Sequence, residues 1–160
     1  MAMKIWVDAD SCPRQVRVII VRAANKKKIL AYFVANRPIA LIAGEYLVAV
    51  ECEKTDQAAD NYILERALPG DLVITRDIPL AKQLVDAGIT VINDRGEEFN
   101  PNTINTRLSI RNFMYELNAA GLKPESTARF NKKDIQKFAA CFDTVLHRLL
   151  VQNAPCSDGG

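Results

Sequence analysis

The chain has 160 residues, of which 49% are hydrophobic and 25% are charged, and its formal net charge is +2. This composition is ordinary for a globular protein with one core, and the near balance of charge gives no sign of nucleic-acid binding through bulk charge. No apolar run approaches the ~20 residues of a membrane span and the first acid comes too early for a signal peptide, so we expect a cytoplasmic protein with no membrane partner.

Predicted strands and helices alternate along the first half of the chain. The segment KIWVD is rich in β-forming residues, and the helix after it has Pro13 near its first position and Ser11 as a candidate cap. A later helix has Thr55 as its candidate cap and is closed by Pro69 and Gly70. The predicted strands span residues 4–8, 29–35 and 46–52, and the helical segments with their caps span residues 11–25 and 55–68.

The second half continues the alternation and then becomes helical. Strands are expected at residues 71–75 and 89–93, with a helix between them that Gly88 ends, and residues 94–102 read as a loop. Two C-terminal helices follow at residues 101–120 and 128–152, the second capped by Asn131.

This order of elements predicts an α/β fold. Strands that alternate with helices of this length favour a three-layer α/β/α sandwich with a mostly parallel, five-stranded sheet, to which the two C-terminal helices are added. We expect a single domain over residues 1–152 and a disordered tail over residues 153–160. The order of the strands cannot be read from the pattern.

Side chains with oxygen atoms follow several of the predicted strands. In an open parallel sheet, ligands bind beyond the carboxyl ends of the strands, so residues at these positions are the first candidates for a site. A further acid, Asp60, lies on the apolar stripe of a helix, where a lone carboxylate needs a partner. The residues after the strands are Asp8, Asp10, Asn36, Asp77 and Asn93.

Several carboxylates without a cluster of histidines suit a hard cation, which predicts Mg²⁺ or Mn²⁺ rather than Zn²⁺. Like charges spaced i, i+4 on a helix, as in Asp56 and Asp60, repel each other unless a cation lies between them. Such an ion can activate water and neutralise charge on a phosphate. The candidate metal ligands are Asp8, Asp10, Asp56, Asp60 and Asp77.

Each acid also has a structural alternative. Asp10 fits a cap of the first helix as well as it fits a metal ligand, and Asp56 in a first helical turn is favoured by the helix dipole alone. Asp77 fits a cap of the helix near Pro79, whereas Asp8 and Asp60 are the hardest to explain by structure. Asp71 and Asp94 are expected in turns.

Basic and amide side chains near the predicted acidic edge are candidates for substrate binding. Arg76 and Arg95 are placed to bind phosphate, although either would also pair with the acids, and Asn36 is grouped with them. Cys12 lies beside the acids at a helix start, but without a base partner it fits packing better than catalysis.

Five segments together resemble the YaiI/YqxD family of bacterial proteins: KIWVDADSCP, VANRP, DQAADNYILERALPGDLVITRDIPLA, NDRGEEF and RLSIRNFMYEL. The resemblance runs from about Lys4 to the final helix. It implies a PIN-like domain, an α/β/α fold in which acids at the carboxyl edge bind Mg²⁺ or Mn²⁺ and cut phosphodiesters of RNA or DNA. It also implies that Asp8, Asp60 and Asp77 are the catalytic acids, to which Asp10 and Asp56 add two further carboxylates.

Three functions remain open from the sequence. The first is a metal-dependent nuclease or phosphodiesterase, with RNA favoured over DNA as the partner. The second is a haloacid-dehalogenase-like phosphatase that uses Asp8 and Asp10 of the D-x-D motif, although Pro13 opens a helix where such enzymes have an irregular turn. The third is a module that binds nucleic acid or protein without catalysis.

Overall fold

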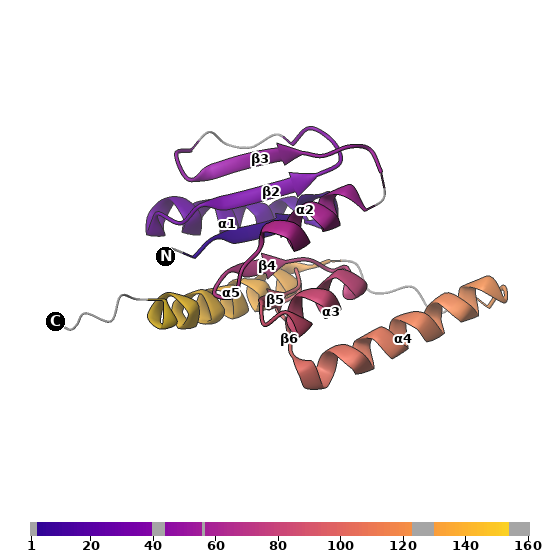
Figure 1. The fold of residues 1–160 in the computed structure, drawn as a ribbon. Helices are drawn as coiled ribbons and strands as arrows, with labels where there is room; N and C mark the ends of the chain where they lie inside the picture. Colours follow the sequence, from indigo (N-terminus) through magenta and orange to yellow (C-terminus); the bar gives the residue numbers. More distant parts are fainter. Residues whose placement is uncertain (1–2, 40–43, 56, 123–129, 154–160) are drawn as a thin grey trace.

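A computed structural model describes residues 3–39, 44–55, 57–122 and 130–153 of the chain. It has a mixed α/β architecture with one six-stranded sheet, and the strands lie in the order β3-β2-β1-β4-β5-β6 (Figure 1). The strands are β1 (Ile5–Asp8), β2 (Ala31–Ala35), β3 (Leu47–Glu51), β4 (Leu72–Ile74), β5 (Thr90–Ile92) and β6 (Glu98–Phe99). The helices are η1 (Ala9–Ser11), α1 (Arg14–Lys27), α2 (Ala58–Arg66), α3 (Ile78–Asp86), α4 (Pro101–Ala119) and α5 (Lys132–Gln152).

The predicted α/β class and the mostly parallel sheet are confirmed, but the prediction of five strands is wrong. The first five strands pair in parallel, and β6 adds an antiparallel strand at one edge, with Ile92 opposite Glu98 and Val91 opposite Phe99. β6 lies within the segment that we expected to be a loop. Two residues are too few to show the alternation that identifies a strand from sequence.

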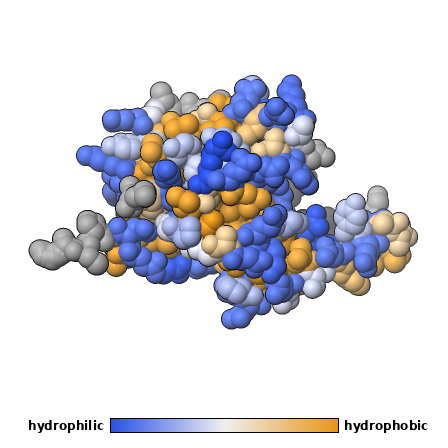
Figure 2. All heavy atoms as spheres, viewed as in Figure 1, coloured by the Kyte–Doolittle hydropathy of each residue, from blue (hydrophilic) through white to orange (hydrophobic). Residues whose placement is uncertain are grey.

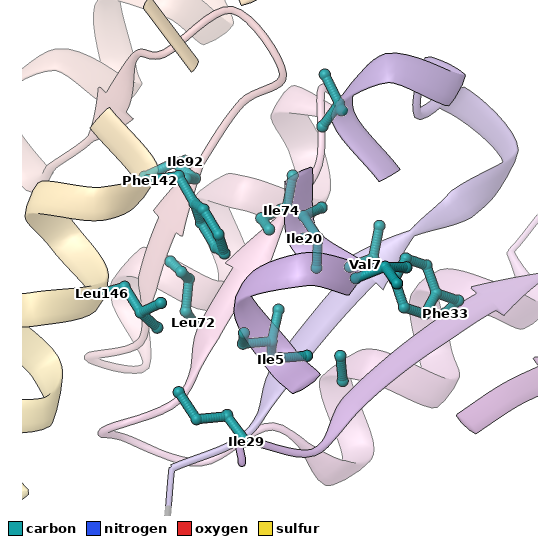
Figure 3. Packing of buried hydrophobic residues seen from close by; sticks show 14 of the residues in the cluster. Ile5, Val7, Ile20, Ile29, Phe33, Leu72, Ile74, Ile92, Phe142 and Leu146 are labelled. Atoms are coloured by element: carbon teal, nitrogen blue, oxygen red, sulfur yellow. The ribbon is translucent and has the colours of Figure 1, made fainter. Parts of the chain in front are cut away.

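Helices cover both faces of the sheet because successive strand residues point to opposite sides. Ile5 and Val7 of β1 belong to the cluster on the face that α1 and α5 cover, which also contains Ile20 of α1 and Phe142 of α5 (Figure 3). Trp6 points to the other face, which α2, α3 and the start of α4 cover. The residues that these three helices bury there are Ala59, Ile63, Leu80, Ala81, Leu84, Val85 and Ile104.

The helix caps differ in part from the prediction. The Asn131 cap of α5 is confirmed, since its side chain accepts a hydrogen bond from Asp134 N at 3.1 Å. Ser11 and Thr55 do not cap their helices, because α1 begins after Pro13 and α2 begins after Gln57, neither with a side-chain cap. Ser11 instead forms part of the short helix η1.

Helix α4 projects beyond the edge of the sheet (Figure 1), and most of its side chains are exposed. Phe113 is 59% exposed and Tyr115 is 70% exposed, and Figure 2 shows apolar and polar residues mixed along this part of the surface. No helix in the described ranges combines the length and the apolar character that crossing a membrane requires. Residues 154–160, most of the predicted tail, lie outside the described residues.

Candidate functional site

The order of the strands creates a crevice between β1 and β4. From β1 the chain moves to β2 and β3 on one side, and β4 and β5 lie on the other, so the connections that leave β1 and β4 diverge. Crevices at such switch points are the usual ligand sites of open parallel sheets. Asp8 ends β1, Asp10 follows in η1, and Asp77 follows β4, so all three acids lie at this crevice.

A cavity of about 490 Å³ opens at this point, and we call it the acidic cavity. The structure brings together six of the predicted site residues in its wall, including Asp60, which α2 carries over the carboxyl end of the sheet. Arg95 does not line this cavity, and Asp56 lies outside the described residues. The six predicted residues in the wall are Asp8, Asp10, Asn36, Asp60, Arg76 and Asp77.

Asp8 is the most buried of these acids, with 8% of its surface exposed. Its Oδ2 accepts a hydrogen bond from Thr75 Oγ1 at 2.9 Å and a longer one from Ser11 Oγ at 3.4 Å. Burial raises the pKa of Asp8, the hydrogen bond from Thr75 lowers it, and the charges of Asp77 and Asp10 raise it further. The position therefore disfavours a lone negative charge and would favour a cation nearby.

Thr75 links the two central acids. Besides donating to Asp8, its Oγ1 accepts a hydrogen bond from Asp77 N at 3.0 Å. Asp77 does cap α3, as the structural alternative predicted, because its Oδ1 accepts from Leu80 N at 3.0 Å. Capping fixes the orientation of the carboxylate and uses one of its two oxygens, so it does not exclude a second role in the cavity.

Asp10 binds the segment that follows β2 and does not cap a helix. Its Oδ2 accepts from Asn36 N at 2.9 Å and its Oδ1 lies 3.4 Å from Arg37 Nε, so the suggestion that Asp10 caps α1 is wrong. Asn36 donates from Nδ2 to Thr55 O at 3.0 Å, while its buried Oδ1 has no hydrogen-bond partner among the described residues. An acceptor in this state costs free energy unless a cation or a donor reaches it.

The pKa of Asp60 is also raised by its place in the cavity. Burial, followed by the charges of Asp77 and Asp8, raises the pKa of Asp60 to about 7, and a hydrogen bond to Asp77 contributes in the same direction. The negative charges of the cavity thus repel one another in the metal-free chain. Relieving that repulsion is what a bound cation would do.

This repulsion predicts that Asp60→Asn stabilises the metal-free protein. The raised pKa means that the stability from Asp60 is present below pH ~4 and is lost as the pH rises through about 7. Asp60 is only half-buried, so we expect a modest gain at pH 8, about 1 kcal/mol or ~2–4 °C in Tm. Thermal melts with EDTA should show this gain at pH 8 and none at pH 4; equal gains at both would contradict the electrostatic cause.

Asp71 and Asp94 lie at turns, as expected, and both are also buried and paired. Asp71 accepts hydrogen bonds from Trp6 Nε1 at 3.0 Å and Lys4 N at 2.9 Å, which anchors β1 beside β4. Asp94 forms an ion pair with Arg76. Both acids therefore have structural partners and are not needed to explain the cavity.

The thiol of Cys12 behaves as expected for a packing residue. Burial raises the pKa of Cys12 to about 12, with the charge of Asp94 adding to it. A thiol with this pKa is not a nucleophile at neutral pH.

Arg95 lines a neighbouring cavity of about 760 Å³, which meets the acidic cavity at Arg76. The arginines of this second cavity already face carboxylates. Arg107 pairs with Glu97, and Arg95 lies 4.0 Å from Asp134. Because these charges largely cancel, the cavity is a weaker anion site than its arginines alone suggest.

The sequence analysis gave no role in the site to Arg111, Ser11 or Thr75. Arg111 comes from α4, more than a hundred residues after Asp8 in the chain, and lines the acidic cavity from the side of the projecting helix. No local pattern marks it, because its place depends on how α4 packs on α3. Thr75 ends the fourth predicted strand, so the rule about strand ends could have identified it.

The donors of the acidic cavity fit a hard divalent cation. Carboxylates of Asp8, Asp60 and Asp77 and the unpaired Oδ1 of Asn36 are oxygen ligands of the kind that Mg²⁺ and Mn²⁺ prefer. Among the described residues, no group of three or more His, Cys, Asp or Glu side chains is arranged so that it could hold a metal ion.

Comparison with known proteins identifies relatives over nearly the whole chain. A family model described as "Uncharacterized BCR, YaiI/YqxD family" matches residues 6–148. The chain is 55% identical over 150 residues to the UPF0178 protein of Treponema denticola, which covers 94% of this chain and 96% of the relative. Identity is 51% to the UPF0178 protein of Treponema pallidum (92% and 84% covered) and 43% to that of Myxococcus xanthus (92% and 97%). No solved structure matches the chain.

Proposed function

The chain belongs to the YaiI/YqxD family, and we propose that it is a PIN-like, divalent-metal-dependent nuclease or phosphodiesterase that acts on RNA or DNA. The observation that carries the proposal is the convergence of four aspartates from three separate parts of the chain on one cavity. Asp8 and Asp10 follow β1, Asp60 comes from α2, and Asp77 precedes α3. Acids with raised pKa values in a cavity are typical of a functional site.

In this proposal, different residues of the cavity have different roles in phosphodiester hydrolysis. Asp8, Asp60 and Asp77 would hold Mg²⁺ or Mn²⁺, with Asp10 and Asn36 beside them. When bound, the ion supplies an activated water and charge neutralisation at the phosphate. Thr75 and the N-terminus of α3 fix the orientation of Asp8 and Asp77, so binding an ion would require movement mainly of Asp60.

Arginines at the rim bind the anionic substrate in this scheme. Arg76 and Arg111 both line the cavity with the acids. Guanidinium groups bind phosphate oxygens through charge-assisted hydrogen bonds, and so Arg76 would exchange part of its contact with Asp94 for the substrate. The arginines hold the phosphate against the repulsion of the aspartates, which explains why basic side chains are needed beside an acidic cavity.

The direct test is cleavage of end-labelled single-stranded RNA and DNA by the purified chain. We expect Mn²⁺-dependent cleavage that EDTA abolishes. The Asp8→Asn variant, purified in the same way, measures any contaminating nuclease. Equal cleavage by the wild type and the variant, or none with Mn²⁺ or Mg²⁺, would reject the proposal.

The phosphatase alternative makes a different prediction. It requires Asp8 to form a phospho-aspartate, although Asp8 is buried and one of its oxygens is already hydrogen-bonded to Thr75. Turnover of an aryl phosphate with trapping of phosphate on Asp8 would favour it. RNA binding without cleavage in any metal would instead favour the non-catalytic module.

A further inference from the structure

A smaller cavity of about 280 Å³ opens beside the acidic cavity, and we call it the side cavity. Asp60, Asp77 and Arg111 line both cavities, so the two are continuous along a shared wall. We propose that the side cavity binds a nucleobase next to a phosphate bound by Arg111, so that the substrate is a polynucleotide rather than a simple phosphoester. The inference rests on the proposed function and extends it to the substrate.

Three amide side chains surround the side cavity. Gln57 and Asn61 lie one turn apart at the start of α2, and Gln83 comes from α3. Each amide offers both hydrogen-bond donors and an acceptor, which is the combination that reads the edge of a base. All three amides are exposed and make no side-chain hydrogen bond to other described residues, so a ligand could replace the water around them.

Three apolar residues of the wall offer a surface for a flat ring beside the charged Asp60, Asp77 and Arg111. Leu64 of α2 is partly buried, Leu80 of α3 is fully buried, and Pro79 lies next to it in the wall. The volume lies just below the range of about 300–1,000 Å³ for drug-sized ligands, so it suits one heterocycle and not a larger group.

Arg111 connects the two cavities. Its Nη1 donates to Asn112 Oδ1 at 3.4 Å, and within the described ranges it forms no ion pair with Asp60 or Asp77, although it lines both cavities with them. A guanidinium in this place can bind the phosphate that joins a base in the side cavity to the scissile position. Phosphate contacts of this kind set the register of the strand and carry no sequence information.

The experiment compares two single-stranded RNA hexamers of equal charge, one with bases and one fully abasic, by fluorescence anisotropy in EDTA at fixed salt. We expect the wild type to bind the hexamer with bases about tenfold more tightly. Gln83→Ala and Asn61→Ala should each remove most of that preference, with little effect on the abasic hexamer. Arg111→Ala should weaken both hexamers by a similar factor. Gln15→Ala, an exposed glutamine on α1, is the matched control and should change neither.

Equal binding of the two hexamers by the wild type would overturn the base site. The same conclusion follows if Gln83→Ala and Asn61→Ala weaken both hexamers equally or weaken neither. Cleavage with Mn²⁺ is scored separately on the hexamer with bases. A preference for bases in EDTA without cleavage supports the base site and rejects the nuclease. Cleavage without a preference for bases supports the nuclease and rejects the base site.

Discussion

Replacing Asp8 or Asp60 with asparagine should abolish Mn²⁺ binding and lower the rate of nucleic-acid cleavage by on the order of 100-fold or more. Each variant removes one anionic ligand from the acidic cavity and leaves a side chain of the same shape. Asparagine at position 8 retains an oxygen that can accept the hydrogen bond from Thr75, so the fold should persist. Calorimetric titration of Mn²⁺ into metal-free protein measures the binding, and the cleavage assay measures the rate.

Asp86→Asn is the control for the loss of one negative charge. Asp86 is exposed at the end of α3 and pairs with Lys82 at 3.0 Å, away from the acidic cavity. This variant should bind Mn²⁺ and cleave as the wild type does. If Asp8→Asn and Asp60→Asn remain folded and still bind Mn²⁺ as the wild type does, these two acids do not form one ion site and the proposed chemistry fails.

Replacing Gly96 with alanine should unfold the protein at a markedly lower temperature. Gly96 has φ +79°, and a Cβ built on it would collide with the backbone oxygen of Lys137 in α5. A left-handed conformation costs an alanine about 1–2 kcal/mol, and overpacking against a rigid helix backbone adds roughly 1–3 kcal/mol. We expect a loss of about 3 kcal/mol or more, which corresponds to a fall of roughly 6–12 °C in Tm.

Gly88→Ala separates the two contributions. Gly88 has φ +80°, nearly the same backbone conformation, but a Cβ there would meet nothing within 4 Å. Its Tm should fall by only about 2–8 °C, because it carries the conformational cost alone. Thermal unfolding of both variants, followed by circular dichroism, makes the comparison. Equal losses would show that the contact between Gly96 and α5 contributes nothing.

Much of the fold could be predicted from the sequence because most helices and strands follow from the pattern of neighbouring residues. Alternating apolar residues in short runs predicted the first five strands, and helical spacing predicted the five α-helices within a few residues of their ends. β6 was missed, since Glu98 and Phe99 are too short a segment for any period to be seen. The predicted helix caps were confirmed less often. The cap at Asn131 was confirmed, whereas the caps predicted at Ser11 and Thr55 were wrong, because α1 and α2 begin a few residues later.

The candidate site was readable in part for the same reason. Asp8 and Asp60 stood out as acids among apolar neighbours, and their place in one cavity agrees with that reading. Asp10 has a defined structural partner in Asn36, and Arg95 lies in a different cavity. These differences arise because the position of a residue after a strand predicts the edge of the sheet at which it lies. It does not predict which side chain the residue contacts there.

The sequence by itself determined the positions of most helices and strands, and with them the acids at the ends of the strands and on α2. Both depend on patterns among residues a few places apart in the chain. Only the tertiary structure decided that β4 lies beside β1, which brings Thr75 to Asp8 and opens the crevice between the two strands. It also decided that α4 carries Arg111 to the rim of that crevice. The physical reason is that strand pairing and helix docking depend on backbone hydrogen bonds and side-chain packing between segments distant in the chain, which no local period records.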